Sequence, residues 1–160
     1  MSKTRFINPD TLGKPPGYTH VVEATMPGRI VYVAGQLGVD RDGHVVGDFR
    51  AQAVQTFENL KHALEAVGGR FENVVKLNSY LVGISHLPVL REVRDLYLPS
   101  QNRPASTTLA IPALAREGAL LEIEAVAVLP APAAAKSAAR TGRRGAAKKR
   151  VSPARRRKGR

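Results

Sequence analysis

The sequence predicts an α+β domain in which a mixed β-sheet carries two helices on one face. Short runs of β-branched and aromatic residues alternate with two longer segments whose apolar residues repeat with helical spacing. Their order along the chain is three strands, a hairpin, a helix, a strand, a helix and two strands. A sheet covered on one side by its helices fits that order. The chain of 160 residues is long enough for one such domain plus an appendage.

Three strands are predicted in the first part of the chain. Residues 5–7 form a short candidate, and a Pro-Pro-Gly stretch at residues 15–17 precedes a second candidate at residues 18–24. Residues 30–34, with the sequence IVYVA, are β-branched and aromatic, which is typical of a strand. An Asp-Gly pair at residues 42–43 then lies between apolar residues and predicts a hairpin turn, because glycine adopts positive φ without strain.

The first helix is predicted after Asp48, whose side chain can cap its amino end. A glycine pair at residues 68–69 ends this helix. The apolar residues between them have helical spacing and lie on one face: Ala53, Phe57, Leu60, Leu64 and Val67.

Strand composition returns at residues 74–82, and a second helix is predicted to follow. Ser85 can cap this helix and Pro99 stops it. Two final strands are predicted at residues 107–111 and 120–129. The apolar face of the second helix carries Leu90, Val93 and Tyr97.

The basic residues are concentrated at the carboxyl end. Residues 131–160 hold 12 of the 25 basic residues and no acidic residue, so the first 130 residues keep 13 basic residues against 13 acidic ones. The final segment is rich in Ala, Pro, Lys and Arg and lacks the large apolar residues of a core, which predicts a disordered tail. We therefore expect a neutral domain at residues 1–130 and a basic tail at residues 131–160.

A flexible polycation attracts phosphate groups, so the tail is a candidate for nonspecific nucleic-acid binding that weakens with salt. It has no aromatic residue for stacking on bases, which argues against sequence-specific recognition. A solvated tail without a dedicated partner is the alternative. The cations of this candidate interface are Arg143, Arg144, Lys148, Lys149, Arg150, Arg155, Arg156, Arg157 and Lys158.

Several functional classes find no support in the sequence. The absence of cysteine excludes disulfides, thiolate catalysis and cysteine metal sites. The four histidines are scattered without the tight spacing of metal ligands, so no metal site is expected. No apolar run reaches membrane-spanning length and no signal peptide is recognisable, so we expect a cytoplasmic protein with no membrane partner.

The last predicted strand carries two carboxylates on one face. Alternation places Glu122 and Glu124 on the same side as Leu120 and two valines. A carboxylate that is partly withdrawn from water and close to a second carboxylate ionises less readily. Such a group can accept a proton or orient a water molecule. Pairing with an arginine, or capping a subunit contact, is the alternative for one or both carboxylates.

Short motifs occur in a fixed order over about residues 5–129. They are GYTH at 17–20, AGQL at 34–37, NLKHALEAVGG at 59–69, VVKLNSYLVGI at 74–84, RPAS at 103–106 and LEIEAVAV at 121–128. In this order and spacing they resemble the RidA/YjgF family of reactive-intermediate (imine) deaminases.

The resemblance implies a chorismate-mutase-like fold assembled as a homotrimer, with a ligand cleft between neighbouring subunits. Family deaminases hydrolyse imines or enamines formed by pyridoxal-phosphate enzymes, releasing a keto acid and ammonia without a metal or cofactor. By this resemblance, Glu122 matches the glutamate that positions or activates the attacking water. Tyr18 matches a tyrosine that lines the cleft, and Gly35 and Gln36 match a loop beside it.

One position departs from the family pattern. Active deaminases have an arginine after Pro-Ala that grips the substrate carboxylate, whereas this sequence has Ser106. A serine cannot form the bidentate, charge-assisted pair, and losing one such bond costs roughly 10- to 150-fold in affinity. Ser106 and Thr107 can still bind a carboxylate through hydroxyl and N–H groups, and Thr108 stands where some relatives have cysteine. Arg91 is a candidate substitute cation, with a solvated position beside Arg94 as the alternative.

The sequence therefore supports three hypotheses. The first is a RidA-like hydrolase in which Glu122 directs water onto a C=N carbon, with classical 2-imino acid deamination weakened by Ser106. The second is a non-catalytic trimer that binds a small metabolite in the intersubunit cleft. The third is a nucleic-acid-associated protein that acts through its basic tail. We rank the hydrolase first and expect Glu124 to be structural.

Overall fold

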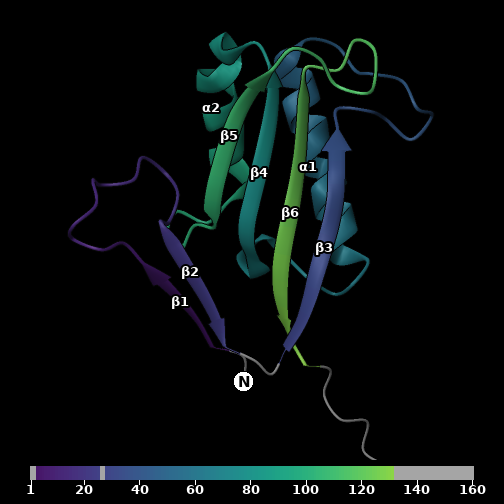
Figure 1. The fold of residues 1–160 in the computed structure, drawn as a ribbon. Coiled ribbons are helices and arrows are strands. Elements are labelled where there is room, and N and C mark those ends of the chain that lie inside the picture. The colour runs from purple at the N-terminus through teal and green to yellow at the C-terminus, as the bar shows by residue number, and fades with distance from the viewer. Residues whose placement is uncertain (1–2, 26–27, 132–160) are drawn as a thin grey trace, which may run out of the picture.

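The computed structural model describes residues 3–25 and 28–131, which form two β-sheets and two α-helices (Figure 1). Most of the expected basic tail lies outside the described residues. The smaller sheet is an antiparallel pair of β1 (Lys3–Ile7) and β2 (Val21–Thr25). The larger sheet consists of β3 (Gly28–Leu37), β4 (Val74–Val82), β5 (Ala105–Ile111) and β6 (Leu121–Pro130).

The helices are α1 (Phe49–Glu65) and α2 (Leu87–Tyr97). Two single-turn 3₁₀ helices, η1 (Phe71–Asn73) and η2 (Ile84–His86), lie directly before β4 and α2. Within the described ranges, no helix combines the length and the apolar composition needed to cross a membrane.

The strands of the larger sheet are arranged in the order β3-β6-β4-β5. β4 and β5 run parallel, whereas the other neighbours are antiparallel. Parallel neighbours require a crossover connection, and α2 lies in the connection between β4 and β5. The prediction of a mixed sheet with two helices is therefore confirmed. The first two predicted strands form a pair of their own and do not join this sheet.

Both helices cover the same face of the larger sheet, and in Figure 1 they lie behind it. Phe57, Leu60 and Leu64 of α1 are almost completely buried in one hydrophobic core with Leu121 and Ile123 of β6. The apolar face of α1 thus packs against the odd-numbered residues of β6, as the two sequence patterns predict. Truncating a buried leucine of this kind to alanine costs about 2–5 kcal/mol.

One predicted helix cap is confirmed and one is wrong. The side chain of Asp48 accepts a hydrogen bond from the N–H of Ala51 at 2.9 Å and caps α1. Ser85 does not cap α2, because it lies inside η2 and α2 begins after His86 without a side-chain cap. The chain turns at Gly83, whose φ is 93°, and a proline in the first turn of α2 supplies the φ that a helix start needs.

The loop before β2 is longer than predicted, because this strand begins three residues later than expected and leaves Tyr18 in the loop. One hydrogen bond fixes this loop to the rest of the chain, and a second joins its two ends. The N–H of Thr19 donates to the carbonyl of Pro104 at 3.2 Å, and the N–H of His20 donates to Oδ1 of Asn8 at 2.9 Å. Because Pro104 directly precedes β5, the loop that carries Tyr18 lies beside the start of that strand.

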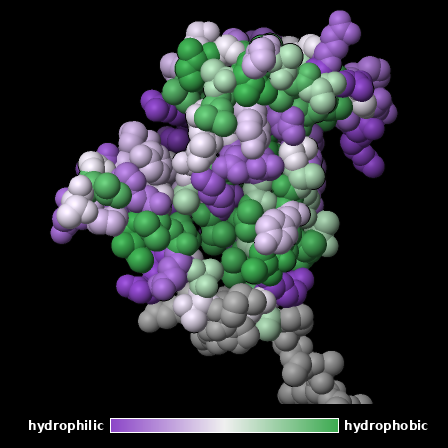
Figure 2. All heavy atoms as spheres, viewed as in Figure 1, coloured by the Kyte–Doolittle hydropathy of each residue, from purple (hydrophilic) through white to green (hydrophobic). Residues whose placement is uncertain are grey.

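The other face of the larger sheet is not covered by either helix (Figure 1). Its exposed apolar side chains include Ile30, Tyr32 and Leu109, which are 51%, 78% and 51% exposed. Figure 2, drawn from this side, shows hydrophobic patches around a hydrophilic area. Exposed apolar patches of this kind mark surfaces that bind a partner. We call this the open face.

Candidate active site

Glu124 is held in place by two neighbours on the open face. Its Oε1 accepts hydrogen bonds from Nδ2 of Asn78 at 2.7 Å and from the hydroxyl of Tyr80 at 3.0 Å. The hydrogen bond to this carboxylate, together with burial and the negative charge, raises the pKa of Tyr80. Glu124 is therefore a fixed acceptor that joins β4 to β6, which agrees with the structural role expected for it.

Glu122 is two residues away on the same face but in a different environment. Its carboxylate lies directly against the backbone of β3, where an added Cβ on Gly35 would fall 1.7 Å from Oε1 of Glu122. The pairing of β3 with β6 shifts register between Val33 and Gln36, so Gly35 lies within the irregular segment. Within the described ranges, the Glu122 side chain makes neither an ion pair nor a side-chain hydrogen bond. The side chain is half-buried.

The resemblance implies that Gly35 and Gln36 form a loop beside the cleft; in the structure both lie in the irregular segment of β3, and their place beside a ligand stays a prediction. Gly35 leaves room for the carboxylate because it has no side chain. Gln36 pairs with Ile123 in the backbone ladder, and its Nε2 donates to the carbonyl of Ala34 at 3.1 Å. Gln36 thus stabilises the irregular segment of β3 in this chain.

Ser106 and Thr108 line a cavity on the helix-covered side of the sheet. This cavity, which we call the inner hollow, has a volume of about 260 Å³ and is also lined by Tyr18 and Arg91. Phe57, Leu77 and Leu90 form part of its apolar wall. A small cavity with apolar walls and a few converging polar groups has the character of a ligand site.

Thr107 does not belong to this cavity, although the sequence grouped it with its two neighbours. Alternation along β5 turns Thr107 to the open face, where its Oγ1 accepts a hydrogen bond from Nζ of Lys76 at 2.6 Å. The hydroxyl groups of Ser106 and Thr107 therefore cannot bind the same carboxylate.

A second, more open cavity adjoins the inner hollow. This outer hollow has a volume of about 600 Å³ and shares Pro16, Tyr18, Arg91 and Arg94 with its neighbour. The alternative that both arginines of α2 lie on its solvated face is wrong for Arg94, whose side chain is only 15% exposed. Arg91 is exposed, yet it lines both hollows.

An ion cluster forms one wall of the outer hollow. Oδ1 of Asp95 accepts from Nη1 of Arg103 at 2.6 Å and lies 2.9 Å from Nη2 of Arg94. Burial alone would raise the pKa of Asp95, but the hydrogen bonds and positive charges of the two arginines lower it below its usual range. The sequence reasoning missed this cluster. Its local signal was the adjacent pair of Arg94 and Asp95 in α2, whereas the contact with Arg103 comes from beyond the helix.

The predicted site residues thus fall into two groups on opposite sides of one sheet. Glu122 faces the open side, whereas Ser106 and Thr108 face the helices. Since side chains on opposite faces of a strand point apart, a single chain does not bring these groups together around one ligand. A site that uses both groups requires a second copy of the chain.

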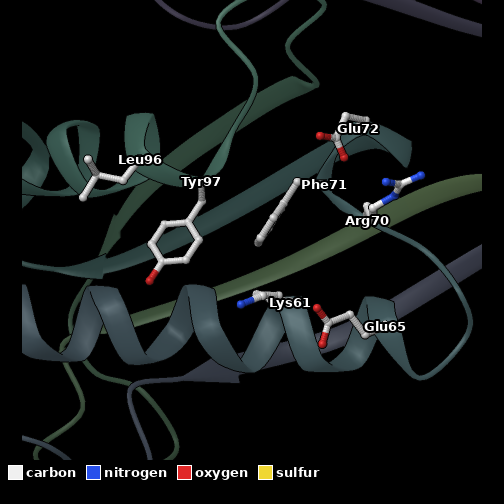
Figure 3. A pocket seen from close by; sticks show the side chains of 7 residues that line it. All are labelled: Lys61, Glu65, Arg70, Phe71, Glu72, Leu96 and Tyr97. Atoms are coloured by element: carbon white, nitrogen blue, oxygen red, sulfur yellow. The ribbon is translucent and has the colours of Figure 1, made fainter.

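Another hollow lies away from all of the predicted site residues. It is formed where the end of α1 meets η1 and the end of α2, with a volume of about 400 Å³ (Figure 3). Lys61 and Glu65 project from α1, and the rings of Phe71 and Tyr97 lie opposite them. Its charged side chains are two cations, Lys61 and Arg70, and two carboxylates, Glu65 and Glu72, so they give a ligand no excess of one charge. It is therefore a weaker candidate for a specific ligand.

Asp40, Asp42 and His44 come together in the turn between β3 and α1, with possible ligand atoms within 4.8 Å of one another. A search for paired histidines overlooks such a group. Oδ1 of Asp40 already accepts the backbone N–H groups of Asp42 and His44, which lower the pKa of this carboxyl group. The hydrogen bonds explain the cluster as a stabilised turn, in agreement with the predicted Asp-Gly hairpin.

Comparison with known proteins supplies the family. A protein-family model described as "Endoribonuclease L-PSP" matches residues 12–129. The chain belongs to this family, also known as RidA/YjgF. A protein of Dermatophagoides farinae named 2-iminobutanoate/2-iminopropanoate deaminase is 31% identical over 132 residues, which cover 81% of this chain and 99% of that protein. The 3-aminoacrylate deaminase RutC of Acinetobacter baylyi is 35% identical over 117 residues, covering 72% and 91%.

Solved structures of the RidA/YjgF family confirm the α+β fold. A Rid-family protein of unknown function from Yersinia pestis, YyfB, has a TM-score of 0.71 and 34% identity, covering 79% of this chain and 98% of that one. RidA from an Antarctic Psychrobacter has a TM-score of 0.61 and 36% identity, covering 78% and 99%. The family therefore includes proteins named as imine or enamine deaminases and others to which no activity is given.

Proposed function

We propose that this RidA-family protein is a cofactor-independent hydrolase of small imines or enamines, with Glu122 as the group that directs water. The observation that carries the proposal is the contrast between two carboxylates on one face. Glu124 is occupied by Asn78 and Tyr80, whereas Glu122 has no such partner within the described ranges and lies against Gly35. A general base has to be near the reacting groups and free to accept a proton.

The reaction proposed for Glu122 is addition of water to a C=N bond. The carboxylate takes one proton from a water molecule while the water oxygen attacks the imine carbon, and Glu122 passes that proton to the imine nitrogen. In the resulting carbinolamine, Glu122 takes the hydroxyl proton and transfers it to the amino nitrogen, the C–N bond breaks to release ammonia, and the C–O bond becomes a C=O bond. Imine and water are thereby converted to a carbonyl compound and ammonia with no change of oxidation state.

The same proposal includes a homotrimer with the ligand in a cleft between subunits. Two features support it: the apolar residues of the open face, and the position of Glu122 on the side opposite Ser106. In a cyclic assembly, each cleft combines the open face of one subunit with the inner hollow of the next. Analytical ultracentrifugation of the full chain tests the trimer, and a monomer at assay concentrations would contradict it.

The test of the chemistry is a coupled assay in which an amino-acid oxidase generates the imine and its disappearance is followed. Glu122→Gln should reduce the rate about 10²- to 10⁴-fold, as expected when a general base is removed. Glu124→Gln is the matched control, because it makes the same change on the same face and should leave most of the activity. Equal rates for the wild type and Glu122→Gln would remove the mechanism.

A second candidate is a trimer that binds a small metabolite without turnover. Ser106 favours it, because the cation that the active deaminases carry at this position is absent from β5. Thermal-shift measurements against keto acids and neutral carbonyl compounds test for binding. Stabilisation by a ligand that is not consumed would support this function over the hydrolase.

The basic tail is proposed to add nonspecific nucleic-acid binding. Residues 131–160 carry twelve cations and no acidic residue, and an assembly with several tails would bind more tightly than one. Binding of DNA or RNA by the full chain should exceed that of a chain ending at residue 130, and the difference should shrink at high salt. Equal binding by the two chains would exclude the tail as the cause. A cytoplasmic location remains a prediction.

A further inference from the structure

The outer hollow combines a large opening with an excess of positive charge. Lys14, Arg91, Arg94 and Arg103 line it together with one carboxylate, Asp95. Neutral hydrogen-bonding side chains complete the wall, among them Asn8, Ser100 and Asn102. A cavity lined mainly by cations and N–H or O–H donors attracts an anion, because each donor can bind an oxygen of that anion.

Two of these cations are held in place and largely withdrawn from water. The side chains of Arg94 and Arg103 are 15% and 16% exposed, and both contact the same carboxylate of Asp95. One negative charge therefore serves two positive charges. The backbone of Gly17 packs against both guanidinium groups, since a Cβ at this glycine would fall 2.5 Å from Nη2 of Arg94 and 3.1 Å from Nη1 of Arg103. A partly buried cation without a full counter-charge is stabilised by an added anion.

Arg91 is the member of the group that is free to move toward a ligand. Among the described residues it has no ion-pair partner and no side-chain hydrogen-bond partner, whereas Arg94 and Arg103 are engaged with Asp95. It also lines both the inner and the outer hollow. Its five N–H donors match the two oxygens of a carboxylate, which a lysine or serine cannot do in the same way.

We propose that Arg91, supported by the cluster of Arg94, Asp95 and Arg103, forms an oxyanion site in the outer hollow that binds a second acidic group of the ligand. The rest of the ligand occupies the inner hollow beside Tyr18 and Ser106. The assignment of that part as the reacting end rests on the proposed hydrolase function, but the oxyanion site itself does not. The ligand class is a small keto or imino acid that carries a further carboxylate at its distal end.

The proposal gives a physical reason for serine at position 106. With a cation on helix α2 instead of strand β5, the strongest attraction for an acidic group lies toward the outer hollow. A ligand with only one acidic group must choose between that cation and the hydroxyl groups of Ser106 and Thr108. A ligand with two acidic groups can use both at once.

The experiment compares two probes that have the same carbon chain and differ at the distal end. 2-Oxoglutarate has a carboxylate there, and 2-oxopentanoate has a methyl group. Isothermal titration calorimetry on the full chain at constant salt should show tighter binding of 2-oxoglutarate by about 10- to 150-fold, the range for one charge-assisted contact. Arg91→Ala should bring the two affinities close to each other.

Arg41→Ala is the matched control. Arg41 is exposed in the turn between β3 and α1, where its substitution removes the same charge and leaves the hollow intact. The preference for 2-oxoglutarate should persist in this variant. Equal affinity of the wild type for the two acids would overturn the proposal. If Arg91→Ala and Arg41→Ala weakened the preference for 2-oxoglutarate equally, the proposal would also be overturned. The preference would then come from the net charge of the protein, including that of the tail, and not from the hollow.

The outcome for the oxyanion site is separable from the outcome for catalysis. A preference for 2-oxoglutarate that depends on Arg91, in a protein without imine hydrolysis, would support the site and remove the hydrolase. Hydrolysis that depends on Glu122, without any preference between the two acids, would support the hydrolase and remove the site.

Discussion

Gly35→Ala tests whether the position of the Glu122 carboxylate, and not only its presence, determines activity. The added Cβ would lie 1.7 Å from Oε1 and 2.6 Å from Cδ of Glu122. Carbon and oxygen atoms that are not bonded stay about 3.5 Å apart, so the carboxylate has to move by roughly 2 Å. A displacement of about 1 Å can cost on the order of 10²-fold in rate, and we expect at least that loss in the imine assay.

Stability should change little in the same variant. The three atoms that would clash, Oε1, Cδ and Cγ, all belong to the Glu122 side chain on the open face, so this side chain can rotate away without disturbing the core. Replacing glycine by alanine also restricts the unfolded chain, which contributes about 0.4–1 kcal/mol in favour of folding where the backbone conformation is allowed. The unfolding midpoint should therefore stay close to that of the wild type.

Gly13→Ala provides the matched control, because a Cβ at this position meets no atom within 4 Å. It should retain full activity. The two variants together separate displacement of Glu122 from the general effect of replacing a glycine. Wild-type activity in Gly35→Ala would refute the argument that the carboxylate acts from its observed position. A large loss of stability would refute the argument that only Glu122 moves.

Three further predictions concern stability and titration. Asp48→Ala should lower the free energy of unfolding in urea by about 1 kcal/mol, since it removes the cap of α1. Burial and a 2.8 Å hydrogen bond from its hydroxyl to Glu58 raise the pKa of Tyr97 to about 12, so its contribution to stability is complete below the unfolded value near 10 and is lost as the pH rises toward 12. Spectrophotometric titration should show a tyrosinate that forms near pH 12 and that Tyr97→Phe removes, while the raised pKa of Tyr80 persists in this variant. Desolvation opposes ionisation of Asp95, but the hydrogen bonds and charges of Arg103 and Arg94 lower its pKa below the unfolded value of 3.8, so its contribution is present above that value and is lost as the pH falls below it; Asp95→Asn should flatten this acid side of the urea-stability profile.

The elements were largely predictable because each is governed by local spacing. The alternation of Glu122 and Glu124 with core residues placed both carboxylates on one face, and the structure agrees. Which of the two is free was not predictable in the same way. That difference arises from Asn78 and Tyr80 on the neighbouring strand β4, which are 46 and 44 residues away from Glu124 in the sequence, and therefore depends on the register between β4 and β6.

Other differences have the same origin in long-range packing. Thr107 was grouped with its neighbours because the start of β5 was predicted two residues too late. With the observed start, Ser106 and Thr108 lie on one face of the strand and Thr107 lies on the other. The burial of Arg94 depends on Arg103 and on the loop at Gly17, which no helix periodicity describes. The wrong cap at Ser85 follows from the 3₁₀ turn that Gly83 initiates.

A sheet that separates the two halves of a site has a genetic consequence. Suppose that each cleft combines the open face of one subunit with the inner hollow of the next. A chain with a defective Glu122 then still has an intact inner hollow, and a chain with a defective Tyr18 still has an intact open face. When both chains are expressed in one cell and assemble at random, about one cleft in four combines an intact open face with an intact inner hollow. Two inactive alleles should then complement each other, and this rescue would vanish in any protein whose chains worked alone.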